Sequence, residues 1–146
     1  MSITQKHIQL VSESFQKVIP ISEQAAELFY SRLFAIAPET EALFEKTRMK
    51  EQGNKLMSTI GAAVAGLRNI DDLVPVIKNL GKRHVKYHVS DEMYQPVGEA
   101  LLWTLEQGLG DAFTEDVKEA WATVYTVIAE TAIAGAHEAL AEEKMI

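Results

Sequence analysis

The chain has 146 residues, contains no cysteine, and carries a formal net charge of −7 at pH 7. This length suits one domain with its own core, and the absence of cysteine excludes disulfides, thiolate metal sites and thioether-linked tetrapyrroles. Because the basic residues form no long stripe, nucleic acid is not an expected partner. No apolar run is long enough for a signal peptide or a membrane span, so we expect a soluble, cytoplasmic protein that binds no membrane.

The first half of the chain has the apolar pattern of helices. Apolar residues recur at three- and four-residue spacing, whereas two-residue alternation is rare, so the pattern predicts an all-α protein. We expect a first helix over Thr4–Val18, ended by Pro20, and a second helix capped by Ser22. A short helix is predicted from Pro38 to Phe44, and a long one over residues 50–67.

The second half continues the helical pattern. A helix is predicted from Asn69 to near Gly81, followed by a basic turn over residues 82–84 and a further helix over 91–107. Thr114 begins the last helix, which we expect to fray over residues 140–146. Seven or eight helices of such unequal length do not suit an up-and-down bundle, so helices packed around a pocket are the favoured architecture.

Four histidines are present, and two of them are candidate metal ligands. His7 and His137 are expected at the surface, which leaves His84 and His88. A helix through His84 places the imidazole on an apolar face, where a buried neutral ring needs a partner such as a metal. A protonated histidine near the C-terminal end of a helix also interacts favourably with the helix dipole, so the spacing alone leaves both interpretations open.

Tyr30 and Gln52 are polar residues at the ends of apolar helix faces. A tyrosine in that position is usually part of the core, with its hydroxyl satisfied, and a glutamine at a helix start is usually solvated. Taken singly, neither residue indicates a binding site. The sequence also contains no glycine-rich phosphate loop, GxSxG or HExxH motif.

Several segments together resemble the globin family over nearly the whole chain. They are FYSRLFAIAPETEALF, LGKRHVKYHV and YQPVGEALL, and the most specific feature is the order of Tyr30, Pro38, Phe44, Gln52, Leu56 and His84. The resemblance is nearest to single-domain bacterial globins, flavohaemoglobin haem domains and neuroglobin. It implies one globin domain over residues 1–146, with a globin fold of seven to eight helices around a pocket for haem b.

The resemblance also implies roles on the proximal side of the haem. His84 corresponds to the histidine that binds the haem iron, and its other ring nitrogen is expected to donate to the Leu80 carbonyl. Phe44 corresponds to the phenylalanine that stacks on the haem edge. Apolar walls that exclude water from the iron are expected from Leu80, Val89, Val97 and Ile128.

On the distal side, Gln52 stands where many animal globins have a histidine. Its pairing with Tyr30 and Leu56 is typical of bacterial globins and flavohaemoglobins, and hydrogen bonds from Tyr30 and Gln52 to bound oxygen imply slow release and high affinity. Gln52 is a poor iron ligand, so an open or water-bound sixth site is expected, with Tyr30 or Lys55 as alternative internal ligands.

Tyr94 corresponds to the proximal tyrosine that flavohaemoglobins link to a glutamate of the last helix. In this chain the glutamate position is Ala136. Glu138 is two residues away, about 200° around a helix, and so does not substitute without a shift in register. This departure weakens any claim of a strong, peroxidase-like electronic push on the iron.

The function implied first is reversible binding of oxygen, and of carbon monoxide and nitric oxide, by a monomer, with a dimer as the other possibility. The alternative is a nitric oxide dioxygenase, in which Tyr30 and Gln52 hold the oxygen that reacts to give nitrate. Because the sequence contains no flavin or nicotinamide domain, this alternative needs an external reductase. A gas sensor or a haemless signalling globin is a further alternative.

Overall fold

The computed structural model describes residues 3–44, 48–86 and 91–144. Over these ranges the helices are α1 (Gln5–Val18), α2 (Ser22–Ile36), α3 (Met49–Gly66), α4 (Ile70–Lys86), α5 (Tyr94–Leu109) and α6 (Glu115–Lys144), joined by the 3₁₀ segments η1 (Ile19–Ile21), η2 (Pro38–Leu43), η4 (Leu67–Asn69), η5 (Asp91–Met93) and η6 (Gly110–Ala112). The all-α prediction is therefore confirmed. His88 and Val89 lie outside the described residues. None of the helices in these ranges combines the length and apolar character needed to cross a bilayer.

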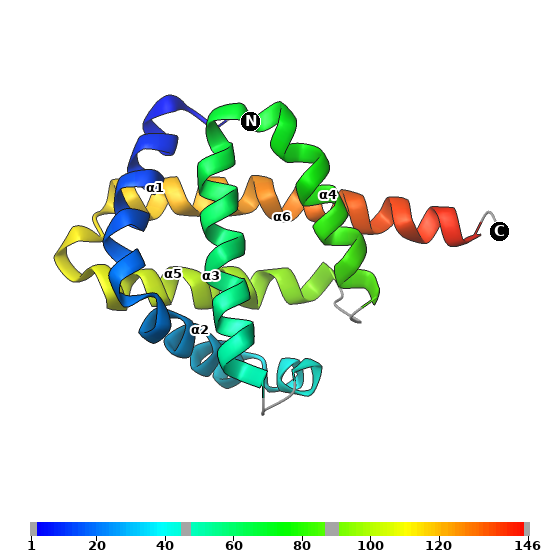
Figure 1. Cartoon of the computed structure of the whole chain (residues 1–146), viewed down its shortest axis with the longest axis horizontal. Helices are drawn as coiled ribbons and strands as arrows, with labels where there is room; N and C mark the ends of the chain where they lie inside the picture. The colour runs from blue at the N-terminus through cyan, green and yellow to red at the C-terminus, as the bar shows by residue number, and fades with distance from the viewer. Residues whose placement is uncertain (1–2, 45–47, 87–90, 145–146) are drawn as a thin grey trace.

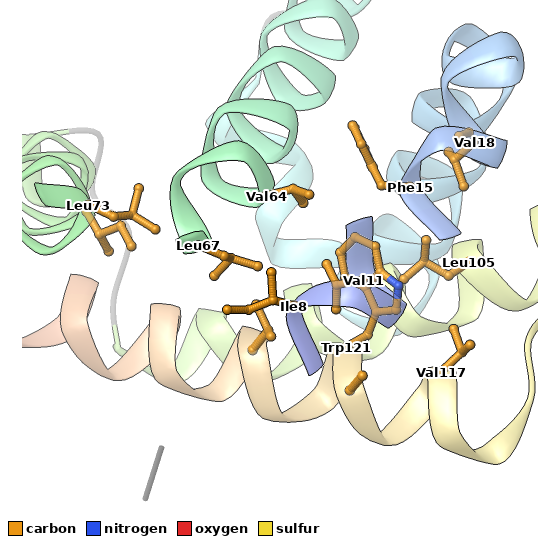
Figure 2. Close-up of a cluster of buried hydrophobic side chains, with 14 of the residues drawn as sticks. Ile8, Val11, Phe15, Val18, Val64, Leu67, Leu73, Leu105, Val117 and Trp121 are labelled. Atoms are coloured by element: carbon orange, nitrogen blue, oxygen red, sulfur yellow. The ribbon is translucent and has the colours of Figure 1, made fainter. Parts of the chain in front are cut away.

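The main core is built on the apolar face of α1. Figure 2 shows α1 side chains beside those of α3, α5 and α6, among them Val11, Val64, Leu105 and Trp121. The Trp121 indole Nε1 donates a hydrogen bond to the Ser14 hydroxyl at 2.8 Å, so the polar atom of this buried ring has a partner. Burial of these faces holds α1 against α6.

An aromatic cluster forms a second core between α2 and α5. Its buried members are Phe29, Tyr30, Leu33, Ala37 and Ala100, and the half-buried side chains packed against them include Phe34, Phe44, Leu56 and Val97. Three helices that are separate in the sequence, α2, α3 and α5, therefore contribute side chains to one apolar region, together with Phe44, which follows η2. Four of the residues for which the sequence predicted a binding role, Tyr30, Phe44, Leu56 and Val97, belong to this cluster.

The prediction that a helix ends near Gly81 is wrong, because α4 continues to Lys86. The helices α4 and α6 cross in Figure 1 and pack against each other. Gly81 is buried, and a Cβ atom there would overlap the Ala132 carbonyl oxygen. In the same contact, a Cβ atom on Gly135 would overlap the Lys78 carbonyl oxygen. Gly81 is therefore needed for the close approach of two backbones rather than for a helix end.

The structure also differs from the expectations at two N-terminal positions. Ser22 is not a cap, since η1 continues into α2 and the Ser22 amide donates to the Ile19 carbonyl. His7 is less exposed than expected for a surface residue, because its side chain is only 13% exposed. His7 completes a capping box with Thr4, and its Nε2 atom lies 3.3 Å from a Glu119 carboxylate oxygen.

The last two helices begin and end largely as expected. Thr114 accepts a hydrogen bond from the Val117 amide at the start of α6, and Gly110, with a φ of 55°, ends α5 in a conformation that favours glycine. The helix α6 continues to Lys144 and projects beyond α4 in Figure 1. Fraying over residues 140–146 stays a prediction.

Candidate functional site

His84 lies near the C-terminal end of α4, with its ring half-buried. Its Nδ1 atom is 3.1 Å from the hydroxyl oxygen of Tyr94, the first residue of α5. Burial, and then the positive charge of Arg83, lowers the pKa of His84 below its usual value. The imidazole is therefore neutral at neutral pH, the form in which a ring nitrogen has a lone pair to offer a metal.

The partner of His84 differs from the one expected. The resemblance implied a hydrogen bond to the Leu80 carbonyl, one turn earlier on α4, whereas the structure puts the Tyr94 hydroxyl beside Nδ1. The two rings are 6.1 Å apart between centroids and inclined at 46°. This partner comes from the next helix, so the orientation of His84 depends on how α5 is placed as well as on α4.

Tyr125 of α6 contacts the backbone of Tyr94. The Tyr125 hydroxyl donates to the Tyr94 carbonyl oxygen at 2.5 Å, and burial raises the pKa of Tyr125. Gly98 makes room for the ring, since a Cβ atom there would lie 2.6 Å from Tyr125 Cε2. Tyr125 was not among the site residues predicted from the sequence. The available signal was a tyrosine on the inward face of the last helix, whose hydroxyl needs a buried partner.

Tyr30 lies in the aromatic cluster, 8% exposed. Its ring meets Phe29 and Phe44 edge to face, with centroids 5.1 and 5.2 Å apart, and its hydroxyl donates to the Gln52 backbone carbonyl at 3.4 Å. Burial raises the pKa of Tyr30 to about 12. The hydroxyl is thus a neutral donor throughout the physiological pH range, held next to the first turns of α3.

The structure brings together some of the predicted site residues and separates others. Tyr30, Phe44, Leu56 and Val97 share the aromatic cluster, and Gln52 joins it through its backbone contact with Tyr30. The remaining residues lie elsewhere: Ile128 and Tyr94 pack against the main core, Leu80 is half-buried on α4, Lys55 is exposed on α3, and Val89 lies outside the described residues.

The carboxylate that flavohaemoglobins place near the proximal tyrosine has no counterpart at Ala136, which is buried on α6. Glu138 pairs with Lys78 instead, at 3.0 Å, and this hydrogen bond lowers the pKa of Glu138. Glu138 is thus held by a lysine of α4, in agreement with the expectation that it does not replace the missing glutamate.

The helices that carry the two halves of the candidate site diverge from a common junction. Figure 1 shows α3 and α4 meeting where η4 joins them and separating toward the start of α3 and the end of α4. Gln52 lies in the first turn of α3, and His84 in the last turn of α4. The predicted distal and proximal residues are therefore carried at the separated ends of this helix pair.

Comparison with known proteins identifies the family. A family model described as Globin matches residues 27–132. Flavohemoprotein of Bacillus subtilis is 33% identical over an alignment of 127 residues that covers 83% of this chain and 32% of that protein. Neuroglobin of Chaenocephalus aceratus is 28% identical over 86% of this chain and 87% of its own length. The chain thus spans about a third of the flavohemoprotein and most of the neuroglobin.

The fold matches solved structures as well. A bacterial globin from Campylobacter jejuni superposes with a TM-score of 0.82 and 24% identity, covering 92% of this chain and 97% of that one. The helical arrangement, the sequence match over residues 27–132 and the relatives therefore agree with one another. The chain belongs to the globin family, which implies that it binds haem.

Proposed function

We propose that this chain holds one haem b on His84 and binds oxygen reversibly under Tyr30 and Gln52. The observation that carries the proposal is the contact between His84 Nδ1 and the Tyr94 hydroxyl. A neutral imidazole that donates through Nδ1 has its lone pair on Nε2, the nitrogen that a proximal ligand offers to iron. The residues present therefore fit a haem. When bound, haem supplies an iron that takes up oxygen, carbon monoxide or nitric oxide and changes between ferrous and ferric.

The distal residues support strong retention of oxygen. The Tyr30 hydroxyl lies in an apolar region, where a hydrogen bond to a charged acceptor is strong. Its contact with the Gln52 carbonyl is long, at 3.4 Å, so little is lost when the hydroxyl turns to a better acceptor. Gln52 is half-buried at the same end of α3 and is the second proposed donor.

Replacing Tyr30 with Phe tests the distal role. We expect the oxygen dissociation rate to rise about 10- to 100-fold, because one hydrogen bond to a charged acceptor contributes about 1.5–3 kcal/mol. Because the pKa of Tyr30 is about 12, the rate in the unmodified protein should stay constant between about pH 6 and 9. Stopped-flow displacement of oxygen by carbon monoxide measures the oxygen dissociation rate of the variant and the pH dependence of this rate in the unmodified protein.

The matched control is the carbon monoxide dissociation rate of the same variant, since bound carbon monoxide is less polar and gains less from a donor. An equal change in both rates would point to altered packing, and no change in the oxygen rate would contradict the role of Tyr30. If the unmodified protein retained no stoichiometric haem, the whole proposal would fail. The haemless alternative would then take its place.

Replacing Tyr94 with Phe tests the proximal role. Removal of the hydroxyl leaves the Nδ1–H group of His84 without its acceptor, so the imidazole donates less electron density and the ferric form is less favoured. We expect the ferric/ferrous midpoint potential to rise by about 20–60 mV, the equivalent of one ordinary hydrogen bond. Tyr125→Phe is the control, because it keeps the Tyr94 hydroxyl and should change the potential less.

Nitric oxide dioxygenation is the alternative function that the globin resemblance implies. The missing carboxylate at Ala136 argues for a weak proximal push and so against the efficiency of such chemistry. Mixing the oxygenated protein with one equivalent of nitric oxide distinguishes the two functions. Stoichiometric nitrate, formed faster than oxygen dissociates, would support the dioxygenase, whereas slow decay would leave reversible binding.

A further inference from the structure

We propose that the exposed face of α4 beside His84 is a docking site for an acidic electron-donor protein, which reduces the ferric form of this globin. The inference rests on the proposed function, because it needs a bound haem. It adds a partner of defined chemistry and a place for that partner on the chain. The transfer itself is simple: the donor loses one electron and the iron gains one, with no bond made or broken.

The docking surface consists of the basic residues Lys82 and Arg83, with Asn79 and the apolar Val76 on the preceding two turns of α4. Val76 is 57% exposed, which is unusual for a large aliphatic side chain in this structure. A groove of about 540 Å³ is lined by Val76, Asn79, Lys82 and Arg83. Positions three and four residues apart lie on one side of a helix, so Val76, Asn79 and Arg83 form one stripe along α4. An exposed apolar group with basic neighbours is typical of a protein contact.

The charge of this surface is opposite to that of the chain as a whole. The chain carries −7, yet residues 73–86 contain Lys78, Lys82, Arg83 and Lys86 and neither aspartate nor glutamate. Glu138 of α6 balances Lys78 at 3.0 Å and also lies in the field of Lys82. The positive charge is therefore concentrated toward Arg83, at the end of the stripe nearest His84.

The position of this charge favours an electron donor over other acidic partners. Arg83 immediately precedes His84, and its charge already acts on the imidazole. A partner bound at the groove would therefore sit within one residue of the proposed iron ligand. A lipid surface is the competing occupant, but membrane-binding helices usually present large apolar anchors such as Trp or Phe. This stripe offers a single valine.

Reduction of the ferric haem protein by an acidic reduced [2Fe–2S] ferredoxin tests the proposal, with stopped-flow detection under carbon monoxide. The second-order rate constant should fall about tenfold as ionic strength rises from about 0.01 to 0.5 M, because salt screens the attraction between the basic surface and the donor. The net charge of −7 alone predicts the opposite, since salt would relieve repulsion and raise the rate. The sign of the salt dependence therefore distinguishes docking at this surface from the overall charge.

In the variant Lys82→Glu/Arg83→Glu, the second-order rate constant at low salt should be about tenfold lower than in the unmodified protein. It should also no longer fall as the salt concentration rises. The control Lys17→Glu/Lys118→Glu makes the same charge change at exposed positions on α1 and α6, and it should keep the fall. A shifted haem potential would change the rate at every salt concentration alike and is measured separately. Haem content and reduction by dithionite are checked first, so that failure of haem binding is recognised as failure of the proposed function.

Three results would overturn the docking proposal while haem binding stands. The rate constant of the unmodified protein could rise with salt, or both double variants could lose the same activity. Alternatively, the unmodified protein could co-sediment with vesicles that contain about 30% phosphatidylserine, whereas Lys82→Glu/Arg83→Glu does not. In that case the rate of reduction of the unmodified protein would not depend on salt. That outcome would assign the basic face to lipid headgroups.

Discussion

The variant His84→Gly should lose stoichiometric haem, with an apparent haem affinity at least about 100-fold below that of the unmodified protein. The His84 imidazole is half-buried and is oriented by the Tyr94 hydroxyl. Among the described side chains of α4, it is the one best suited to bind iron. Without this imidazole, a bound haem would lose its proposed protein ligand on α4 and would be held by the other pocket residues alone. Haem transfer to an apo-acceptor globin, followed by the Soret absorbance, measures the loss.

Added imidazole should restore a five-coordinate ferrous spectrum to His84→Gly, because the glycine leaves space for a ring of the same size. His137→Gly is the control, since that exposed histidine lies on α6 and should not affect haem retention. A His84→Gly protein with normal haem content and an unchanged iron–histidine stretching band would show that another residue is the ligand. His88, the second candidate from the sequence, would then be tested in the same way.

The variant Gly81→Ala is the substitution with the largest expected effect on stability, although it adds one methyl group. The new Cβ atom would overlap the Ala132 carbonyl oxygen, and backbone atoms on both sides leave no side chain free to move aside. We expect the free energy of unfolding to fall by about 3 kcal/mol or more, as the helices α4 and α6 are forced apart. Urea denaturation monitored by circular dichroism measures this change.

Gly61→Ala provides the matched comparison. A Cβ atom there would lie 3.5 Å from Phe15 Cε2, an ordinary contact, within the middle of α3. Because alanine is favoured over glycine in a helix interior by about 1 kcal/mol, this variant should be as stable as the unmodified protein or more so. Equal stability of Gly81→Ala and Gly61→Ala would contradict the close contact between α4 and α6.

The sequence was most informative where several residues had to act together. Tyr30 and Gln52 had ordinary interpretations when taken singly, but their order with Phe44 and Leu56 indicated one region, and the structure brings Tyr30, Phe44 and Leu56 into one cluster. The helical periodicity was sufficient for the all-α class, because apolar spacing depends on local geometry that each helix expresses by itself.

Predictions failed where the deciding partner is distant in the sequence. Gly81 has the local signature of a helix end, but its neighbour is Ala132 on another helix, which no local pattern reports. The partner of His84 was expected one turn earlier on the same helix, and Tyr94 of α5 lies there instead. His7 was predicted at the surface, because the pattern of α1 alone does not show its contact with Glu119. That contact depends on how α1 packs against α6. Each failure is a tertiary contact between helices.

The contact between Gly81 and Ala132 also affects how His84 can move. Side chains between helices normally absorb small displacements by changing rotamer, but at this point two backbones meet and there is no side chain on Gly81 to adjust. We therefore expect a displacement of His84 along α4 to move the backbone of α6 at this contact. Ligand binding is accordingly expected to alter amide exchange on α6 around Ala132.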